Sequence, residues 1–290
     1  MSDFRKARDF LLIFVMCSVW AGNYFVIKDS VAYSSPVLFA LLRSVGAGIL
    51  LIALARSELR MLKARDWAML SLIGLFQVTL FYVPLNEGLK TVSSSVAATL
   101  VYTQPVFVVA LSPLVGERLT PFKVAGVIFA FIGVGTIFLP DLEKSGLAIG
   151  DALELLASIS WVISVLIYKR WKHSLGHYVV PGVQNMVGAL FIIPFLALET
   201  PYLNLAAPPF LLDLIYIVVL GSGLAYVIYF RALTRMQASV FSSYLFMVPT
   251  LTTLFESLLT LTVPGIYQIV GTLMVSAGIV IVNRDFSART

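Results

Sequence analysis

Charged side chains are scarce in this chain of 290 residues, of which only 12% are Asp, Glu, Lys or Arg. A typical soluble domain carries about 25% charged residues. Hydrophobic residues make up 59% of the sequence, and the mean hydropathy is +0.95. Because a soluble protein cannot cover its surface with so few charges, this composition excludes the soluble, disordered and secreted disulfide-rich classes.

Cysteine and histidine are also scarce. Cys17 stands alone, so neither an intramolecular disulfide nor a cysteine-based metal cluster can form. Both histidines, His173 and His177, fall in or beside one predicted loop, and the sequence contains no His-Glu-x-x-His motif and no phosphate-binding loop. We therefore predict no catalytic residue, no metal site and no cofactor.

Ten apolar segments follow one another along the chain, separated by charged or Pro/Gly-rich breaks. A membrane-spanning helix needs about 20 predominantly apolar residues. The first segment follows three basic residues, as in a signal peptide, but it is long and ends in bulky aromatics, so we interpret it as a retained helix. The sequence thus predicts an all-α integral membrane protein with ten transmembrane helices. The predicted spans are 10–27, 36–55, 67–86, 91–114, 120–139, 149–168, 178–198, 210–230, 237–261 and 265–282.

Lys and Arg residues are divided unevenly between the two sets of loops. With the N-terminus inside, 16 of the 20 fall in inner segments, whereas only Lys28, Lys90 and Lys144 fall in outer loops. Cytoplasmic loops of membrane proteins carry such an excess of basic residues. The bias predicts a multi-pass protein of the plasma membrane, the bacterial inner membrane, with both termini in the cytoplasm. It also explains the net charge of +5 without a nucleic-acid partner.

The two halves of the chain resemble each other at a nearly constant offset. Each half, predicted at 8–140 and 148–284, holds five spans, so the second half crosses the membrane in the opposite sense. Inverted repeats of this kind are typical of secondary transporters. At offsets of 141 to 145, the matching pairs are Trp20 and Trp161, Lys28 and Lys169, Tyr82 and Tyr226, Ser95 and Ser239, Pro105 and Pro249, Gly126 and Gly271, and Gly133 and Gly278.

Motifs along the first half carry a family resemblance. They are Trp20 to Tyr24, Leu42-Arg43, Tyr82 to Leu89, Thr91 to Ala97 leading to Pro105, Gly116 to Thr120, and Gly126 to Gly135. Together with the five-plus-five repeat, they resemble the drug/metabolite transporter superfamily, specifically its EamA-type ten-helix members, over nearly the whole chain. Within this family the resemblance is to YddG-type exporters of aromatic amino acids. It implies export of aromatic or other amphipathic amino acids by alternating access.

The second half departs from the pattern, because Leu261 stands where the repeat would place a partner of Glu117. Strict symmetry of gating is therefore not expected. We predict that Glu117 and Arg118 fix the turn between spans 4 and 5.

Polar and aromatic side chains recur at comparable depth in several spans. Such residues could line a mostly apolar cavity with a few hydrogen-bonding groups, which suits a substrate with an apolar body. Paired prolines at mid-span also point to a transporter's substrate site, although both could simply shape the bundle. Some aromatics could instead belong to the interfacial belt. The predicted substrate-binding residues are Trp20, Asn23, Tyr24, Gln77, Tyr82, Tyr102, Gln104, Pro105, Trp161, Tyr226, Tyr244 and Pro249.

Three charged residues fall within or near the ends of spans: Arg43, Glu87 and Glu256. A lone charge in hydrocarbon costs about 2.5–3.5 kcal/mol on insertion scales, so such charges usually face the interior and pair. We predict that Arg43 pairs with a carboxylate of the outer half. Alternatively, Arg43 binds a substrate carboxylate, and Glu87 or Glu256 couples transport to protons.

Spans 5 and 10 are rich in small residues, which favours a scaffold role or a dimer face, so monomer and homodimer both stay open. The predicted partners are a small-molecule substrate and the lipid bilayer. Three rival functions remain. A nucleotide-sugar or other anionic-metabolite carrier should show more basic residues within its spans than Arg43 alone. A membrane-embedded enzyme would need an acid–base constellation, and a structural protein would not need paired mid-span prolines.

Overall fold

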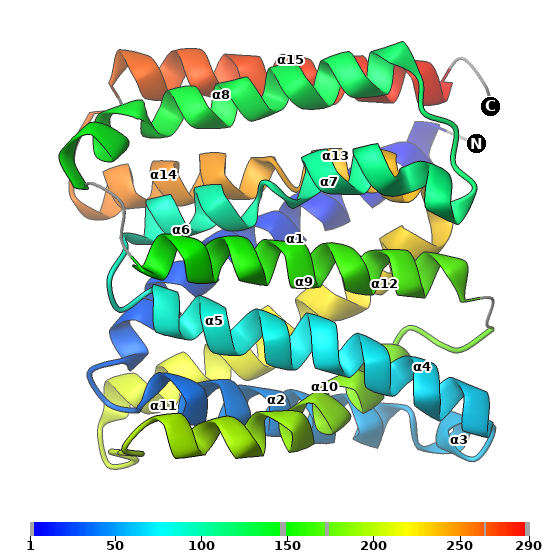
Figure 1. The fold of residues 1–290 in the computed structure, drawn as a ribbon, viewed down its shortest axis with the longest axis vertical. Helices are drawn as coiled ribbons and strands as arrows, with labels where there is room; N and C mark the ends of the chain where they lie inside the picture. The colour runs from blue at the N-terminus through cyan, green and yellow to red at the C-terminus, as the bar shows by residue number, and fades with distance from the viewer. Residues whose placement is uncertain (1–2, 146–148, 172–173, 264, 288–290) are drawn as a thin grey trace.

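The chain folds as a bundle of helices, seen in a computed structural model that describes residues 3–145, 149–171, 174–263 and 265–287. Within these residues, ten helices are long and apolar enough to cross a membrane. They run side by side, and both termini lie at the same end of the bundle (Figure 1), which we call the terminal end. The predicted fold class, an all-α membrane protein with ten transmembrane helices, is confirmed.

Five spans are continuous α-helices. In hydrocarbon every backbone polar group must be satisfied within the protein, and an unbroken helix achieves this within one segment. A short helix, α3 (Arg56–Leu59), follows the second span at the terminal end. The continuous spans are α1 (Asp3–Ser30), α2 (Pro36–Leu54), α8 (Pro121–Ser145), α9 (Ile149–Arg170) and α15 (Ile266–Ser287).

Spans 3 and 8 are each interrupted by a π-helical segment, which makes one turn wider than an α-helix and often marks a functional site. The first segment, shifted by the repeat offset of 144 residues, falls within the second one. The two repeats therefore share this irregularity. Span 3 is built from α4 (Ala64–Gly74), η1 (Leu75–Thr79) and α5 (Leu80–Gly88). Span 8 is built from α11 (Pro208–Ile215), η4 (Tyr216–Leu224) and α12 (Ala225–Arg235).

Spans 4 and 9 are broken near their middle, as the paired prolines predict. Pro105 and Pro249 each stand just after the break, in the first turn of the second half-helix. Span 4 comprises α6 (Ser94–Val101), α7 (Gln104–Leu111) and η2 (Ser112–Val115). Span 9 comprises α13 (Ala238–Tyr244) and α14 (Met247–Leu259), and span 7 comprises α10 (Val179–Ile192) and η3 (Ile193–Leu198).

Helices α8 and α15 lie together at one edge of the bundle (Figure 1) and meet through glycines. A Cβ atom added to Gly133 would lie 2.8 Å from the carbonyl oxygen of Gly271, and one on Gly126 would lie 2.8 Å from that of Gly278. Gly271 is the repeat equivalent of Gly126, and Gly278 is that of Gly133. Each of the two glycines of α8 therefore contacts the repeat equivalent of the other one. This crossed pairing is what a two-fold axis between inverted repeats produces.

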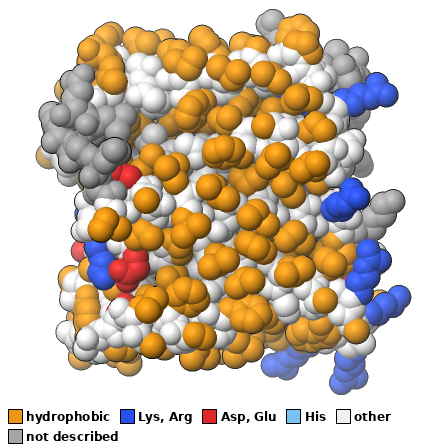
Figure 2. Space-filling model, viewed as in Figure 1, with side chains coloured by type: hydrophobic (Ala, Val, Ile, Leu, Met, Phe, Trp, Pro, Cys, Tyr) orange, Lys and Arg blue, Asp and Glu red, His pale blue; other side chains and the backbone are white. Residues whose placement is uncertain are grey.

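The lateral surface fits a bilayer. Hydrophobic side chains cover the face of the bundle in Figure 2, and Lys and Arg side chains gather at the terminal end, on the right of the view. This arrangement agrees with the uneven loop charges. The second predicted repeat begins at residue 148, which lies outside the described residues.

Candidate substrate site

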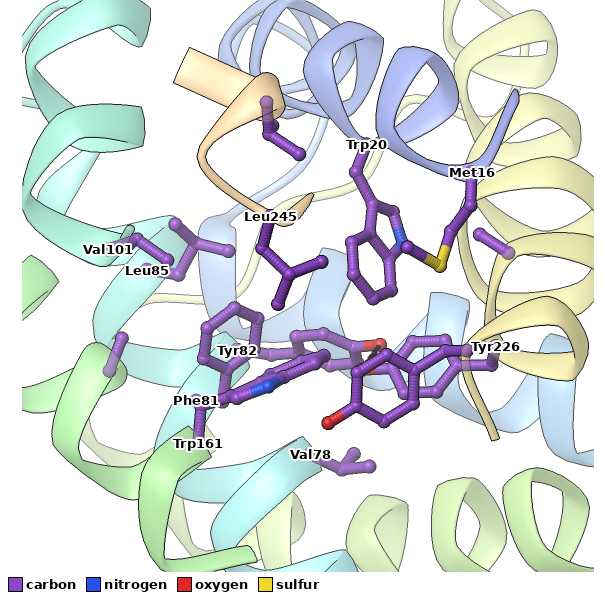
Figure 3. Packing of buried hydrophobic residues seen from close by; sticks show 14 of the residues in the cluster. Met16, Trp20, Val78, Phe81, Tyr82, Leu85, Val101, Trp161, Tyr226 and Leu245 are labelled. Carbon is purple, nitrogen blue, oxygen red and sulfur yellow. Dashed lines mark hydrogen bonds between the residues drawn. The ribbon is translucent and has the colours of Figure 1, made fainter. Parts of the chain in front are cut away.

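Two pairs of repeat-equivalent aromatic residues meet at the centre of the bundle. The indole rings of Trp20 on α1 and Trp161 on α9 are 5.4 Å apart in an edge-to-face arrangement. The hydroxyl of Tyr82 on α5 donates a hydrogen bond of 2.9 Å to that of Tyr226 on α12. Figure 3 shows the ring of Trp20 pointing toward those of Trp161, Tyr82 and Tyr226. The pseudo-two-fold axis of the repeats therefore passes through this cluster.

Further rings extend the cluster toward the terminal end. Tyr229 lies 5.5 Å from Trp20 and 5.2 Å from Trp161, and it also contacts Phe241 at 5.3 Å. Tilted and edge-to-face pairs of this kind contribute about 0.5–1.5 kcal/mol each beyond burial of their area. The stack therefore closes the centre of the bundle on its terminal side.

A small cavity of about 30 Å³ adjoins this cluster. All of its lining side chains are buried, and they come from six spans of both repeats. A substrate can enter only when the helices around the cavity move apart. The lining residues are Trp20, Asn23, Tyr24, Ile27, Arg43, Phe81, Tyr82, Leu85, Tyr102, Gln104, Trp161 and Tyr226.

Four predicted substrate-binding residues lie outside this lining. Gln77 is buried in η1, and Pro105 and Pro249 are buried beside the helix breaks, so the prolines shape the bundle here. The Tyr244 hydroxyl points away and donates a hydrogen bond of 2.8 Å to Asn283 of α15. Its position near the break made Tyr244 look central, but a helix presents only one side to the cavity.

Three apolar lining residues, Ile27, Phe81 and Leu85, were not among the predicted substrate-binding residues. Ile27 follows Asn23 and Tyr24 by one helical turn, and Leu85 follows Tyr82 by three residues. Side chains three or four residues apart share one face of a helix. This spacing could have identified Ile27 and Leu85, which carry no polar group to single them out.

Arg43 is buried with neutral partners. Its Nε and Nη2 atoms donate hydrogen bonds of 3.2 and 3.0 Å to the hydroxyl of Ser222, and its Cζ lies 3.8 Å from the centre of the Tyr82 ring. Among the described residues no carboxylate forms an ion pair with Arg43, and Glu87 pairs with Lys90 at 2.8 Å.

The prediction of an outer-half carboxylate partner for Arg43 is therefore wrong in this structure. A hydroxyl and an aromatic face hold the guanidinium instead, and Glu256 lies half-buried on α14. A cation held by neutral groups in a closed cavity remains available for an anion.

Two carboxamide oxygens of the same cavity accept no hydrogen bond from the residues that the structure describes. They are Oδ1 of Asn23 and Oε1 of Gln104, and both side chains are buried. A buried acceptor without a donor costs about 1–3 kcal/mol. The cavity thus combines one cation, two free acceptors and several aromatic faces.

The remaining candidates for chemistry lie elsewhere. His177 is in the loop before α10, where burial and the nearby Arg231 and Arg235 lower its pKa. It does not line the cavity, and His173 lies outside the described residues. Within the described part of the chain, no group of three or more His, Cys, Asp or Glu side chains could hold a metal ion.

A sequence profile of the EamA-like transporter family matches this chain twice, over residues 8–139 and 148–284. The chain belongs to the EamA-like transporter family. With ten apolar helices, it is a multi-pass integral membrane protein. The two matches correspond to one EamA-like unit in each half of the chain.

Several proteins resemble this EamA-like chain over nearly its full length. Transporter YvbV of Bacillus subtilis is 26% identical over 298 residues, covering 100% of this chain and 96% of YvbV. A transporter of Archaeoglobus fulgidus is 28% identical over 284 residues, covering 94% and 96%. Protein PecM of Dickeya dadantii is 28% identical over 288 residues, covering 96% and 92%. A solved structure shares the fold, with a TM-score of 0.79 and 19% identity over 95% of this chain and 96% of that one.

The two ends of this EamA-like bundle share one repeat-related contact. The Lys28 ammonium donates to the carbonyl of Val92 at 2.9 Å, and its equivalent, Lys169, donates to the carbonyls of Leu233 and Met236 at 2.9 and 2.7 Å. In each case a lysine satisfies carbonyls in the last turn of a helix or just beyond its end, where free carbonyls need donors. The lysines therefore hold α1 and α9 against equivalent segments at opposite ends.

Glu117 makes a contact that has no such counterpart. Its carboxylate accepts hydrogen bonds from the backbone N–H groups of Ala238 and Ser239 and from the Ser239 hydroxyl, the last at 2.6 Å. It thereby caps α13 in the other repeat. Glu117 was predicted to fix the turn between spans 4 and 5, and the structure adds a contact of its carboxylate with the start of α13. At the other end the equivalent position is Leu261, which is exposed.

Proposed function

We propose that this EamA-like transporter carries zwitterionic amino acids with an apolar body, aromatic ones in particular, by alternating access around the central cavity. The observation that carries this proposal is Arg43, a buried cation that lines an aromatic cavity and pairs with no carboxylate of the described residues. Export is the direction implied by the resemblance to YddG-type exporters.

The polar groups of the cavity match the two charges of an amino acid. The Arg43 guanidinium suits the carboxylate, because an arginine fork can donate two hydrogen bonds to it. The free oxygens of Asn23 and Gln104 suit the ammonium group, which carries three donors. The rings of Trp20 and Trp161 suit an apolar or aromatic side chain.

Alternating access follows from the repeats. Tyr82 and Tyr226 join the repeats at the axis, so the halves can rock about this contact. The excess of basic residues at the terminal end supports a cytoplasmic location for that end. We place the protein in the bacterial inner membrane with both termini in the cytoplasm, acting as a monomer or homodimer without an enzymatic activity.

A second candidate substrate class is the anionic metabolites, including nucleotide-sugars. Arg43 favours this reading as well, since a guanidinium binds phosphate as readily as carboxylate. However, Arg43 is the one cationic side chain among the lining residues, whereas a nucleotide-sugar carries two phosphate charges. We therefore rank this class second.

Counterflow in liposomes tests both candidates. Purified protein is reconstituted with an internal store of unlabelled solute, and entry of radiolabelled L-phenylalanine, L-tryptophan or a nucleotide-sugar is compared with empty liposomes. We expect amino-acid accumulation that is lost in Arg43→Ala and retained in Lys63→Ala, a loop control. Exchange of nucleotide-sugars alone would overturn the amino-acid proposal, and no exchange of any solute by folded protein would overturn transport of both classes.

A further inference from the structure

Glu154 is a buried carboxyl group that the substrate cavity does not use. It lies in the second turn of α9, and its exposed fraction is 0%. Neither of its carboxyl oxygens has a hydrogen-bond partner among the described residues. An ionised carboxylate is not stable in apolar surroundings without a donor or a cation, so Glu154 holds a proton in this conformation.

The position of this carboxyl depends on two glycines. A Cβ atom added to Gly88 on α5 would lie 2.5 Å from Oε1 of Glu154 and 3.1 Å from the carbonyl oxygen of Gly150. The carboxyl group thus fills the space of the missing side chain at position 88. It is enclosed at the interface between α5 and α9 and meets water only if these helices separate.

The acidic and basic groups near Glu154 are not placed to compensate a carboxylate at this position. On its own helix, Asp151 stands one turn closer to the helix start and is half-buried. On α5, Glu87 and Lys90 form an ion pair with each other at 2.8 Å. No cation of the described residues forms an ion pair with Glu154.

The other helices around α9 present few titratable groups at this level. Tyr24 on α1 and Tyr102 at the end of α6 line the cavity, and Lys28 of α1 is bonded to the carbonyl of Val92. Helix α4 carries Arg65 and Asp66 at its start, at the terminal end, and η1, α7 and η2 contain no Asp, Glu, Lys, Arg or His.

One face of α9 connects Glu154 to the substrate cavity. Ser158 and Trp161 follow Glu154 by four and seven residues, so the three side chains share this face. Ser158 is hydrogen bonded at 2.9 Å to Thr103, in the break of span 4, and Trp161 lines the cavity. A movement of α9 that exposes Glu154 therefore also moves Trp161 and the broken span.

We propose that Glu154 is the proton-binding site through which a proton gradient drives this carrier, an inference that rests on the proposed transport function. When α5 and α9 separate, the O–H bond of the carboxylic acid breaks. The proton passes to water, and the electron pair stays on the carboxylate. When the carboxylate takes a proton from water on the other side, the interface closes again. One conformational cycle then moves a proton against the direction of substrate.

The test uses liposomes containing wild type, Glu154→Gln or the matched control Asp151→Asn. L-Phenylalanine counterflow is measured at equal pH on both sides, and accumulation is then measured under an imposed pH difference while an internal dye reports proton movement. Glu154→Gln, which mimics the neutral acid, is expected to keep counterflow but lose both gradient-driven accumulation and proton movement. Wild type and Asp151→Asn are expected to keep all three.

Two outcomes would overturn the proton site while leaving transport intact. One is gradient-driven accumulation by Glu154→Gln at the wild-type level, and the other is counterflow by wild type without any response to a pH difference. Failure of counterflow in wild type would instead count against the proposed function.

Infrared difference spectroscopy on the purified proteins, between acid and alkaline buffer, tests the site without any substrate. The 15 Asp and Glu residues all contribute protonated-carboxyl bands, so the contribution of Glu154 is obtained by subtracting the Glu154→Gln spectrum from that of wild type. Wild type and Asp151→Asn should share a titrating component that Glu154→Gln lacks, and identical carboxyl bands in wild type and Glu154→Gln would overturn the proposal.

Discussion

Tyr82 and Tyr226 occupy equivalent positions in the two repeats and are hydrogen bonded to each other at 2.9 Å. Both side chains are about 1% exposed, so neither hydroxyl has access to bulk water. A bond between equivalent residues lies on the axis about which the halves exchange their roles. In the proposed alternating-access cycle, exchange of the two halves maps this contact onto itself, so the halves can rock about it.

The losses of stability caused by replacing these two tyrosines should not be additive. Tyr82→Phe leaves the Tyr226 hydroxyl buried without its partner, at a cost of about 1–3 kcal/mol, whereas the double change to Phe removes both polar groups. We expect a lower melting temperature for each single variant in detergent, and for the double variant a smaller loss than the sum. Strictly additive losses would show that the two hydroxyls are not coupled.

Arg43→Met should raise the KM for amino-acid counterflow. A hydrogen bond to a charged group contributes about 1.5–3 kcal/mol, which corresponds to roughly 10- to 100-fold in affinity. Arg43→Lys keeps the charge but not the two-pronged geometry, so its KM should lie between those of wild type and Arg43→Met. An unchanged KM in Arg43→Met would assign Arg43 to structure alone.

The glycine contact between α8 and α15 should be intolerant of a single methyl group. Gly133→Ala places a Cβ 2.8 Å from a backbone oxygen, and overpacking of this kind costs about 1–3 kcal/mol. Gly135 on the same helix is the matched control, because nothing lies within 4 Å of its Cβ position. Thermal unfolding should show a lower melting temperature for Gly133→Ala and no loss for Gly135→Ala. Equal losses would mean that helix–helix approach is not limiting.

Glu117→Gln should open the terminal end more often. The change removes a charge that accepts three hydrogen bonds at the start of α13. Cys17 reports such opening, since it is the only cysteine in the sequence and its side chain is fully buried. We expect faster labelling of Cys17 by a water-soluble maleimide in Glu117→Gln.

The matched control for this labelling is Glu58→Gln, because Glu58 also accepts a backbone N–H at the terminal end, from Gly176 at 2.9 Å. Its labelling rate should stay at the wild-type level. Equal acceleration in both variants would point to general loosening of that end.

The fold and most of the cavity could be predicted because they depend on patterns within single spans and on the repeat. Run length and loop charge identify the spans, and the shared offset places Trp20 with Trp161 and Tyr82 with Tyr226. Eight of the twelve predicted substrate-binding residues line the cavity in the structure.

The contacts between distant segments could not be predicted in this way. Arg43 selects a hydroxyl and a ring from other spans, and Glu117 reaches a helix start more than 100 residues away. In the sequence Glu154 resembles a solvated charge near the start of a span, and its burial against Gly88 is seen only in the structure. In each case the partner is set by packing between helices, on which the sequence of one span carries no information.

The most direct test of the central claim compares competitors of L-phenylalanine counterflow in wild-type liposomes. Phenethylamine has the aromatic ring and the ammonium group of phenylalanine but lacks its carboxylate. If Arg43 holds the carboxylate, L-tryptophan should inhibit counterflow and phenethylamine should not. Inhibition by phenethylamine as strong as that by L-tryptophan would contradict the assignment of Arg43 and of the cavity around it.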